Sequence, residues 1–438
     1  MDESLSLHFM LPIIGENVFN IAIGLVYSRF ISTISGSALA AIGLANNVQA
    51  VLFGFFGIFI TGTAVLVARH VGAGNGKEAA ETVEQSVFLT LVVTIAVAIG
   101  FILSAGGLMR LLMPASDDAM RGEAAAYFRM LMISLPGYIL YSMLSAVFRS
   151  LGDGRTPLLG SVVMNLSLLG SAWLFIRVLR WEAIGAGLAY VVSRLACAGF
   201  LFVVLLHDHR HFALRTKNFF RPKAATCGRI LRLGIPCGIE GVFLNMGYML
   251  GNTMALALGA LHGNVFQILT TLTTFATIPQ AICANIALSA AGRLLGAKRY
   301  GDVHKAGGGI WWGGILSQMF LTGIVVVFAA EFSGLYSSDA AVIGESARIM
   351  WVILFVNAAG ISINAIDPQL RAGGDVRFVM AVTLSAVWLV RLPLSWLFCF
   401  YWDMGVFGIF LANGISLWIR AVLGLIRWSG KKWMYKKV

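Results

Sequence analysis

Apolar runs long enough to cross a lipid bilayer recur along the whole sequence. A transmembrane helix needs about 20 consecutive apolar residues, and twelve such runs can be placed on the chain, near 8–30, 46–69, 84–106, 124–148, 156–177, 183–206, 229–255, 264–290, 308–332, 344–366, 378–401 and 404–427. Hydrophobic residues make up 58% of the chain and charged residues only 12%, so lipid must cover most of its surface. The runs lack the alternating pattern of membrane-spanning strands, so only helices can satisfy the backbone. The sequence therefore predicts an all-α membrane protein with twelve transmembrane helices.

Lysine and arginine collect in every second predicted loop and at the C-terminus. Cytoplasmic loops carry an excess of these residues, so we expect these loops and both termini to be cytoplasmic. The protein would then be multi-pass in a cell membrane, either a bacterial inner membrane or a plasma membrane. The net charge of +12 reflects this orientation and not binding to nucleic acid. The basic residues are Lys77; Arg210, Arg215, Lys217, Arg221 and Lys223; Lys298, Arg299 and Lys305; and Lys431, Lys432, Lys436 and Lys437.

The second half of the chain repeats the first. The matching segments follow one another in the same order in both halves, and they are 12–19 with 236–243, 69–73 with 293–297, and 149–155 with 371–377. We therefore expect two homologous six-helix bundles, residues 1–206 and 229–438, joined by a basic cytoplasmic linker at 207–228. An even number of spans in each half makes the repeats parallel. This arrangement suits an alternating-access transporter with its substrate cavity between the halves, and a duplicated channel is the alternative.

Six motifs are spread along the chain. They are LPIIGENVFNIAIGLV at 11–26, LVARHVGAGNGKEA at 66–79, FRSLGDGRTPLL at 148–159, LRLGIPCGIEGVF at 231–243, LRAGGDVR at 370–377 and VRLPLSW at 390–396. In this order they resemble the multidrug and toxic compound extrusion (MATE) family of the multidrug/oligosaccharidyl-lipid/polysaccharide flippase superfamily, and the resemblance covers essentially the whole chain.

The resemblance implies a secondary active transporter and not an enzyme. It implies export of small organic compounds, often cationic or amphiphilic and including xenobiotics, by alternating access in antiport with protons or sodium. No cofactor besides the coupling ion is implied. We expect a monomer, because both halves of the pathway lie in one chain, with the substrate and membrane lipid as its partners.

Two glutamates lie at matching positions inside predicted spans, Glu16 in the first and Glu240 in the seventh. An acidic residue in a span costs about 2.5–3.5 kcal/mol on insertion scales, so both should face the bundle interior or water. The resemblance implies carboxylates that bind the coupling ion, and these two are the candidates. The alternative is that each glutamate bonds a nearby backbone group or Asn17 and fixes helix packing. Pro12 and Pro236 are either bend points or helix starts.

Four polar residues are candidates for the lining of the substrate cavity: Asn20, Tyr27, Asn165 and Asn245. Asn20 and Tyr27 lie near one face of the first predicted helix. The resemblance implies acidic residues at three positions, in many relatives at the first and in some at the third, where this chain has Tyr27, Leu169 and Asn245. The identity of the coupling ion, and coupling itself, are therefore left open.

Arginines inside the spans bear on the alternatives. Arg194 and Arg391 either bind an anion or form structural ion pairs, and we expect ion pairs. A flippase for a lipid-linked or amphiphilic substrate, which needs a cationic cavity, is one alternative function. An uncoupled facilitator with a degenerate ion site is another. A membrane enzyme would need clustered histidines and acids at one surface, and the predicted outer loops lack such a histidine cluster.

Two loop features complete the prediction. Asp153 and Asp375 follow glycines in turns after the fourth and tenth spans, where they can cap the next helix, and we expect Arg149 and Arg371 to pair nearby. The sequence HDHRH at 207–211 lies at the basic end of the sixth span, and we expect no metal site there.

Overall fold

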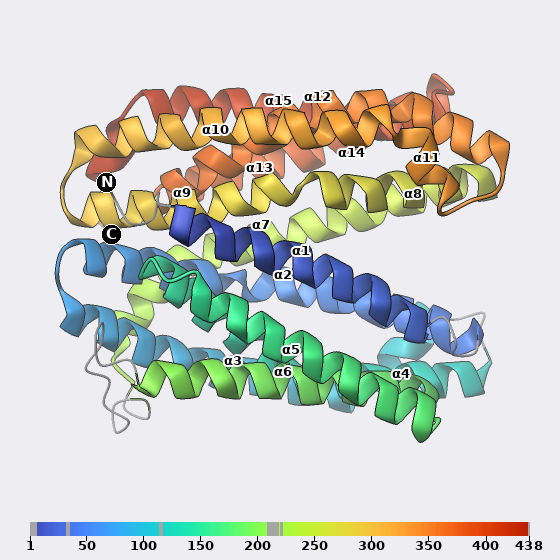
Figure 1. Cartoon of the computed structure of the whole chain (residues 1–438), viewed down its shortest axis with the longest axis horizontal. Coiled ribbons are helices and arrows are strands. Elements are labelled where there is room, and N and C mark those ends of the chain that lie inside the picture. The colour runs from blue at the N-terminus through green and yellow to red at the C-terminus, as the bar shows by residue number, and fades with distance from the viewer. Residues whose placement is uncertain (1–6, 32–35, 114–116, 208–218, 220–221, 437–438) are drawn as a thin grey trace. The chain divides into compact units, whose positions relative to one another are not determined.

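The computed structural model describes residues 7–31, 36–113, 117–207, 219 and 222–436 (Figure 1). Every regular element within these residues is a helix. In the described part of the chain, eleven helical segments are long and apolar enough to cross a membrane, and the first helix contains a shorter apolar stretch, Leu11–Gly24. The predicted all-α membrane protein is confirmed.

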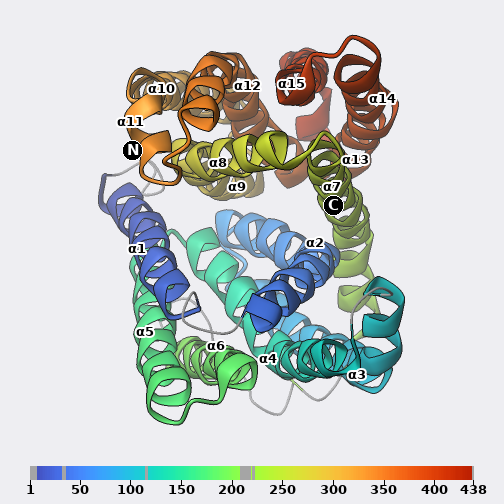
Figure 2. The same ribbon diagram turned by 90° about the vertical axis from the view of Figure 1, so that its right-hand side faces the viewer.

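The chain divides into two compact units, Met1–Ile235 and Pro236–Val438, which we call unit 1 and unit 2. In unit 1, α4 is the central helix and packs against α2, α3 and α6, while α1 packs on α5 (Figure 2). The helices of unit 1 are α1 (Leu7–Ile31), α2 (Gly36–Gly72), α3 (Gly76–Leu112), α4 (Asp118–Ser150), α5 (Arg155–Ala172), the π-helical turn η2 (Trp173–Val178), α6 (Glu182–His207) and the first part of α7 (Ala224–Ala257).

Unit 2 is built around α12, which packs against α9, α10 and α15. Its eleventh predicted span alternates between α-helical and π-helical turns from Val376 to Tyr401. The helices of unit 2 after α7 are α8 (Ala260–Ala276), α9 (Ile278–Gly296), α10 (Tyr300–Val327), α11 (Ala329–Gly334), α12 (Ala340–Ala372), α13 (Val376–Ser385), η4 (Ala386–Arg391), α14 (Leu392–Trp396), η5 (Leu397–Tyr401), α15 (Gly405–Ser429) and the 3₁₀ turn η6 (Lys432–Tyr435).

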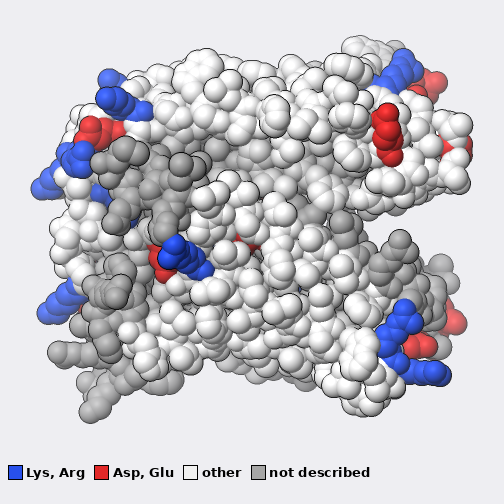
Figure 3. Space-filling view, viewed as in Figure 1, with Lys and Arg blue, Asp and Glu red and all other residues white. Residues whose placement is uncertain are grey.

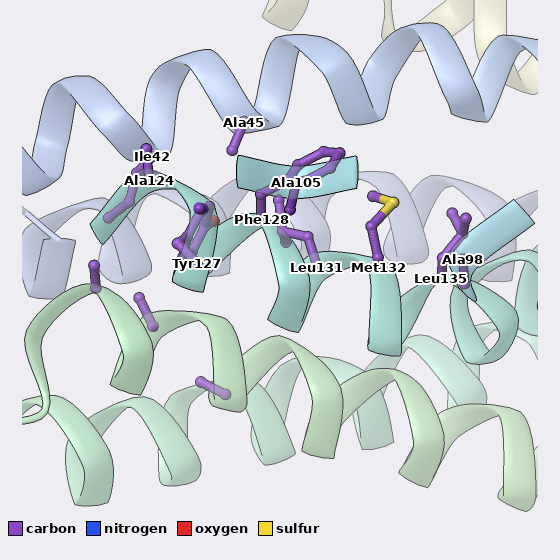
Figure 4. Packing of buried hydrophobic residues seen from close by; sticks show 14 of the residues in the cluster. Ile42, Ala45, Ala98, Ala105, Ala124, Tyr127, Phe128, Leu131, Met132 and Leu135 are labelled. Carbon is purple, nitrogen blue, oxygen red and sulfur yellow. The ribbon is translucent and has the colours of Figure 1, made fainter. Parts of the chain in front are cut away.

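The core of unit 1 joins large side chains of α4 to small residues of its neighbours. Tyr127, Phe128 and Leu131 of α4 are fully buried and pack in one cluster with Ala45 of α2 and Ala105 of α3 (Figure 4). In a bilayer, close packing drives helix association because lipid tails are as apolar as the side chains. Small residues therefore set how closely α2 and α3 approach α4.

The predicted span 264–290 is wrong as one continuous helix, because the chain breaks at Thr277 between α8 and α9. Pro279 has no backbone N–H and cannot continue the hydrogen-bond ladder of α8. Gln318 of α10 donates from Nε2 to the carbonyl oxygen of Ala276 at 2.7 Å and satisfies this helix end. By contrast, Pro12 and Pro236 lie inside α1 and α7, so the interpretation of these prolines as helix starts is wrong.

Charged side chains gather near the ends of the helices, and the middle of the visible face is largely free of charge (Figure 3). This distribution agrees with helices that cross a membrane. The predicted linker at 207–228 lies largely outside the described residues, and its end belongs to α7. There Lys223 Nζ pairs with Glu81 Oε2 of α3 at 2.6 Å, and Thr226 Oγ1 donates to Glu81 Oε1 at 2.7 Å. The start of α7 is therefore fixed to α3 within unit 1.

Candidate functional site

Glu16 of α1 forms a buried ion pair with Arg149 in the last turn of α4. Arg149 Nη2 donates to Glu16 Oε1 at 2.7 Å and to Oε2 at 2.8 Å, and Glu16 is only 5% exposed. Asn17 donates to the carbonyl oxygen of Ile13 on its own helix, so it is not the partner of Glu16. The carboxylate is thus neutralised by a guanidinium and does not depend on a neighbouring amide for its charge balance.

Glu240 of α7 forms the corresponding pair with Arg371 in the last turn of α12. Arg371 Nη2 donates to the two Glu240 oxygens at 3.0 and 2.9 Å, and Thr383 Oγ1 of α13 donates to Oε1 at 2.8 Å. Arg420 of α15 donates from Nη2 to Glu240 Oε1 at 3.0 Å and to Asp367 Oδ2 at 2.6 Å. Two carboxylates and two guanidinium groups therefore form one charge-balanced cluster inside unit 2.

The same glutamate–arginine pair occurs in both units, and the sequence prediction missed it. Arg149 and Arg371 pair with glutamates, and these partners were not predicted from the sequence. Asp153 does cap the next helix, since its Oδ1 accepts from the backbone N–H of Arg155 at 2.8 Å. Asp375 instead pairs with two basic side chains, Arg427 and Lys436, each at 2.6 Å.

Asp367 and Arg420 were also missed. Arg420 lies inside the predicted span 404–427, and Asp367 lies one residue beyond the predicted span 344–366. An ionisable residue in a span signals a functional or paired group, so this signal was present in the sequence. The sequence does not show that Asp367 and Arg420 are neighbours, because they lie on different helices that come together only when α12 packs against α15.

The structure brings two of the four predicted lining residues together. Asn165 Nδ2 of α5 donates to Asn20 Oδ1 of α1 at 2.6 Å, and it also donates to the carbonyl oxygen of Ser161. Tyr27 is buried, and its hydroxyl donates to the carbonyl oxygen of Ala186 at 3.4 Å. Asn245, in unit 2, donates to the carbonyl oxygen of Gly241 on its own helix. Their role in a substrate cavity stays a prediction.

Arg194 and Arg391 are both buried, and neither has a carboxylate within 4.0 Å in the part of the chain that the structure describes. The expected structural ion pairs are therefore not found among these residues. Arg194 lies 4.2 Å from the ring centre of Tyr138 and 4.5 Å from that of Tyr190. Arg391 lies 4.4 Å from the ring centre of Tyr248. Aromatic faces, and not acidic groups, surround both cations.

The search for a metal site gives no candidate among the described residues. No group of three or more histidine, cysteine, aspartate or glutamate side chains there is arranged to hold a metal ion. The HDHRH segment lies outside the described residues except for His207, which approaches the carbonyl oxygen of Val203 through Nδ1 at 2.9 Å.

Comparison with known proteins gives one consistent result. The sequence profile of the MatE family matches twice, at residues 12–173 and 236–397, so the two matches begin at the repeat partners Pro12 and Pro236. Thermotoga maritima has a relative named as a probable multidrug resistance protein, NorM. It is 27% identical over an alignment of 443 positions that covers 98% of this chain and 92% of the relative.

Solved structures match the fold over nearly the whole chain. A crystal structure of MATE in the straight conformation superposes with a TM-score of 0.87 at 18% identity, covering 98% of this chain and 95% of the other. A MOP superfamily transporter from Pyrococcus furiosus, described by a reverse polarity of its binding pocket that suggests a different function, gives a TM-score of 0.90 at 18% identity, covering 98% and 96%. At this identity both matches show the fold alone.

Proposed function

The chain belongs to the MatE family, and from this membership we propose that it is a secondary transporter that moves small organic, amphiphilic compounds out of the cell. Support comes from the relative named as a probable multidrug resistance protein, which aligns with 98% of the chain. The described residues provide buried polar networks within multi-pass helical units, as a transporter requires, and transport and not catalysis is therefore the proposed activity.

The observation that carries a coupling mechanism is the buried pair of Glu16 with Arg149, repeated as Glu240 with Arg371. Coupled transport needs an element with two states whose populations depend on ion binding. A proton that binds Glu16 removes the negative charge that holds Arg149, so α1 is released from the end of α4. In an export cycle, a proton that enters from the outside would break this contact, and release of the proton into the cytoplasm would restore it.

The same geometry favours protons over sodium as the coupling ion. Sodium would need several oxygen ligands around it, and the guanidinium of Arg149 already occupies the cation position 2.7 Å from the Glu16 carboxylate. A proton needs only one carboxylate oxygen and can compete with the guanidinium without a cage of ligands. Sodium antiport is therefore the less favoured form of the proposal.

An uncoupled facilitator is a second candidate, and one observation favours it. Arg420 bridges Glu240 and Asp367, so in unit 2 a side chain stands where a mobile cation would bind two carboxylates. Because the Arg420 guanidinium already neutralises both carboxylates, this site would not exchange ions during transport. If the pair in unit 1 is equally permanent, substrate would move down its own gradient alone.

The test is uptake of fluorescent organic compounds, one cationic and one anionic, into proteoliposomes under proton or sodium gradients imposed separately. Coupled transport predicts uptake that follows the proton gradient and is lost in Glu16→Gln. The matched control is Glu331→Gln, the same change at an exposed position of α11, which should leave uptake unchanged. Uptake independent of both gradients would select the facilitator, and no uptake of either compound would refute transport of this class.

A further inference from the structure

Arg194 lies near the middle of α6, inside the six-helix bundle of unit 1, where three helices meet. It is 6% exposed, and its Nη1 donates to Ser134 Oγ of α4 at 2.7 Å. Its Nη2 lies 3.4 Å from Gln49 Oε1 of α2, and turning the Gln49 amide over brings the oxygen to 2.9 Å from Nη2. In either orientation Gln49 serves as an acceptor for the guanidinium. The cation of α6 therefore meets neutral acceptors from α2 and α4.

Among the described residues, no carboxylate contacts Arg194 to balance its charge. Arg149, Arg371 and Arg420 each pair with a carboxylate, whereas none of the described carboxylates lies within 4.0 Å of Arg194. Arginine cannot lose its proton in a protein. Hydroxyl, amide and aromatic groups solvate the guanidinium but leave one positive charge uncompensated in the low-dielectric interior. Such a group is a functional candidate by default in a membrane protein.

We propose that Arg194 binds the anionic group of the transported molecule, an organic monoanion bearing a carboxylate, a sulfonate or a phosphate diester. The guanidinium fork matches the paired oxygens of these groups, and one uncompensated charge calls for one negative charge. This inference rests on the proposed transport function and names its substrate class. Tyr138 and Tyr190 flank the guanidinium, with ring centres 4.2 and 4.5 Å from its central carbon, so the organic part of such a molecule would approach an aromatic surrounding.

The depth of Arg194 separates a transported anion from a membrane phospholipid. Arg194 is about half the length of α6 (Glu182–His207) from either end of that helix, or roughly 20 Å at 1.5 Å per residue. Phospholipid phosphates lie at the surfaces of the bilayer, whereas transporter substrate sites lie near the midplane. The close contact of α4 and α6 holds this position, since a Cβ atom on Gly137 would lie only 3.1 Å from the carbonyl oxygen of Arg194.

The sharpest test places a carboxylate of the protein itself next to the Arg194 guanidinium, so that the position of the anionic ligand is already filled. Gln49→Glu changes one atom of the side chain and places a carboxylate where the amide already meets Nη1 and Nη2. The matched control is Asn47→Asp, which adds the same charge two residues earlier on α2 at an exposed position. Full-length protein in lipid nanodiscs is titrated by calorimetry with 2-naphthalenesulfonate, 2-naphthoate and methyl 2-naphthyl phosphate, and with the cation (2-naphthylmethyl)ammonium.

We expect the wild type to bind at least one naphthyl anion more tightly than the cation. Gln49→Glu should weaken that binding by at least about tenfold, because its own carboxylate occupies the guanidinium, while Asn47→Asp should bind like the wild type. Arg194→Gln should lose the binding as well. Gln49→Glu should also raise the melting temperature, so this variant keeps the test valid if Arg194→Gln does not fold.

Three results would overturn the assignment of Arg194: no binding of any naphthyl anion to the wild type, equal binding of the cation, or unchanged anion binding in Gln49→Glu. These titrations use no ion gradient. If the protein binds the anion but shows no gradient-driven uptake, the proposed coupling is refuted and the anion site stands. If it shows gradient-driven uptake but binds no anion, the coupling stands and the anion site is refuted. Titration with dimethyl phosphate alone, next to methyl 2-naphthyl phosphate, measures how much of the binding depends on the aromatic part.

Discussion

Individual arginines set the charge balance inside each unit. Arg149 in unit 1, and Arg371 with Arg420 in unit 2, neutralise buried carboxylates at distances of 2.6–3.0 Å. Removing one partner of a buried pair leaves the other charge unpaired, and this is more harmful than removing both. The stability of each unit should therefore depend on matched numbers of acidic and basic groups more than on any single contact.

Arg149→Met tests this at the residue scale. The variant keeps the apolar stem but leaves the Glu16 carboxylate buried without a cation, so we expect a loss of about 3–5 kcal/mol in the free energy of unfolding. Adding Glu16→Gln to this variant should restore most of the loss, because the unpaired charge is then gone. Denaturant titration of the purified protein in detergent micelles measures all three proteins.

The control for this cycle is Arg299→Met. Arg299 pairs with Asp302 in an exposed position, with side chains 62% and 50% exposed, and such surface pairs contribute about 0–1 kcal/mol. A loss in Arg149→Met no larger than that in Arg299→Met would show that Glu16 is not held as a buried charge. A double variant as unstable as the single one would point to lost packing instead.

At the scale of the helical elements, α2 and the first part of α7 cross closely within unit 1. A Cβ atom on Gly62 would lie 2.7 Å from the carbonyl oxygen of Ile230, and one on Gly234 would overlap the carbonyl oxygen of Ile58. Backbone atoms cannot move aside as side chains can. Glycine at both positions is thus a condition for this crossing, which places α7 beside α2.

Gly234→Ala should therefore destabilise the protein by about 1–3 kcal/mol, the usual effect of overpacking. Gly228→Ala on the same helix is the matched control, because nothing lies within 4 Å of its added Cβ atom. There alanine should stabilise α7 by up to about 1 kcal/mol, since it favours the helix over glycine. Thermal unfolding followed by circular dichroism compares the two, and equal melting temperatures would contradict the close crossing.

Helices with long apolar runs were predictable from the sequence, whereas contacts between distant helices were not. The repeat of Pro12 and Glu16 as Pro236 and Glu240 located both glutamates, because matching segments are visible in the chain itself. Arg149 lies 133 residues from Glu16 in sequence, and no local pattern gives their 2.7 Å contact. The one available indication was that the glutamate and the arginine both recur at matching positions in the second half of the chain. The break between α8 and α9 was missed because its flanks are equally apolar.

For the whole molecule, the orientation in the membrane follows from the placement of basic residues. The basic segments of the sequence lead us to expect both termini in the cytoplasm. Fusion of a fluorescent protein that matures only in the cytoplasm to Val438 should give fluorescent cells, and fusion of alkaline phosphatase there should give no enzyme activity. The reverse pattern would place the C-terminus outside and invert the direction of the proposed transport.

The two units carry related but unequal ion pairs, and this inequality predicts which unit responds to protons. Among the described residues, Glu16 accepts hydrogen bonds from one side chain, Arg149, whereas Glu240 accepts them from three, Arg371, Thr383 and Arg420. A contact held by one donor opens at a smaller free-energy cost than one held by three, so we expect the contact in unit 1 to change during transport. Glu16→Gln should lower proton-driven uptake by about tenfold or more, within the usual range of coupling between two sites.

Glu240→Gln should lower the melting temperature more than Glu16→Gln does, and it should change uptake per folded molecule less. This variant removes one negative charge and leaves Arg371 and Arg420 with Asp367 as their remaining carboxylate. We therefore expect the loss of stability to exceed the loss of proton-driven uptake. Rates of uptake normalised to the folded fraction separate the two effects. A larger loss of normalised uptake in Glu240→Gln than in Glu16→Gln would move the responsive contact to unit 2. Arg420 would then have to release Glu240 during each transport cycle, because a permanently bridged carboxylate cannot exchange a proton.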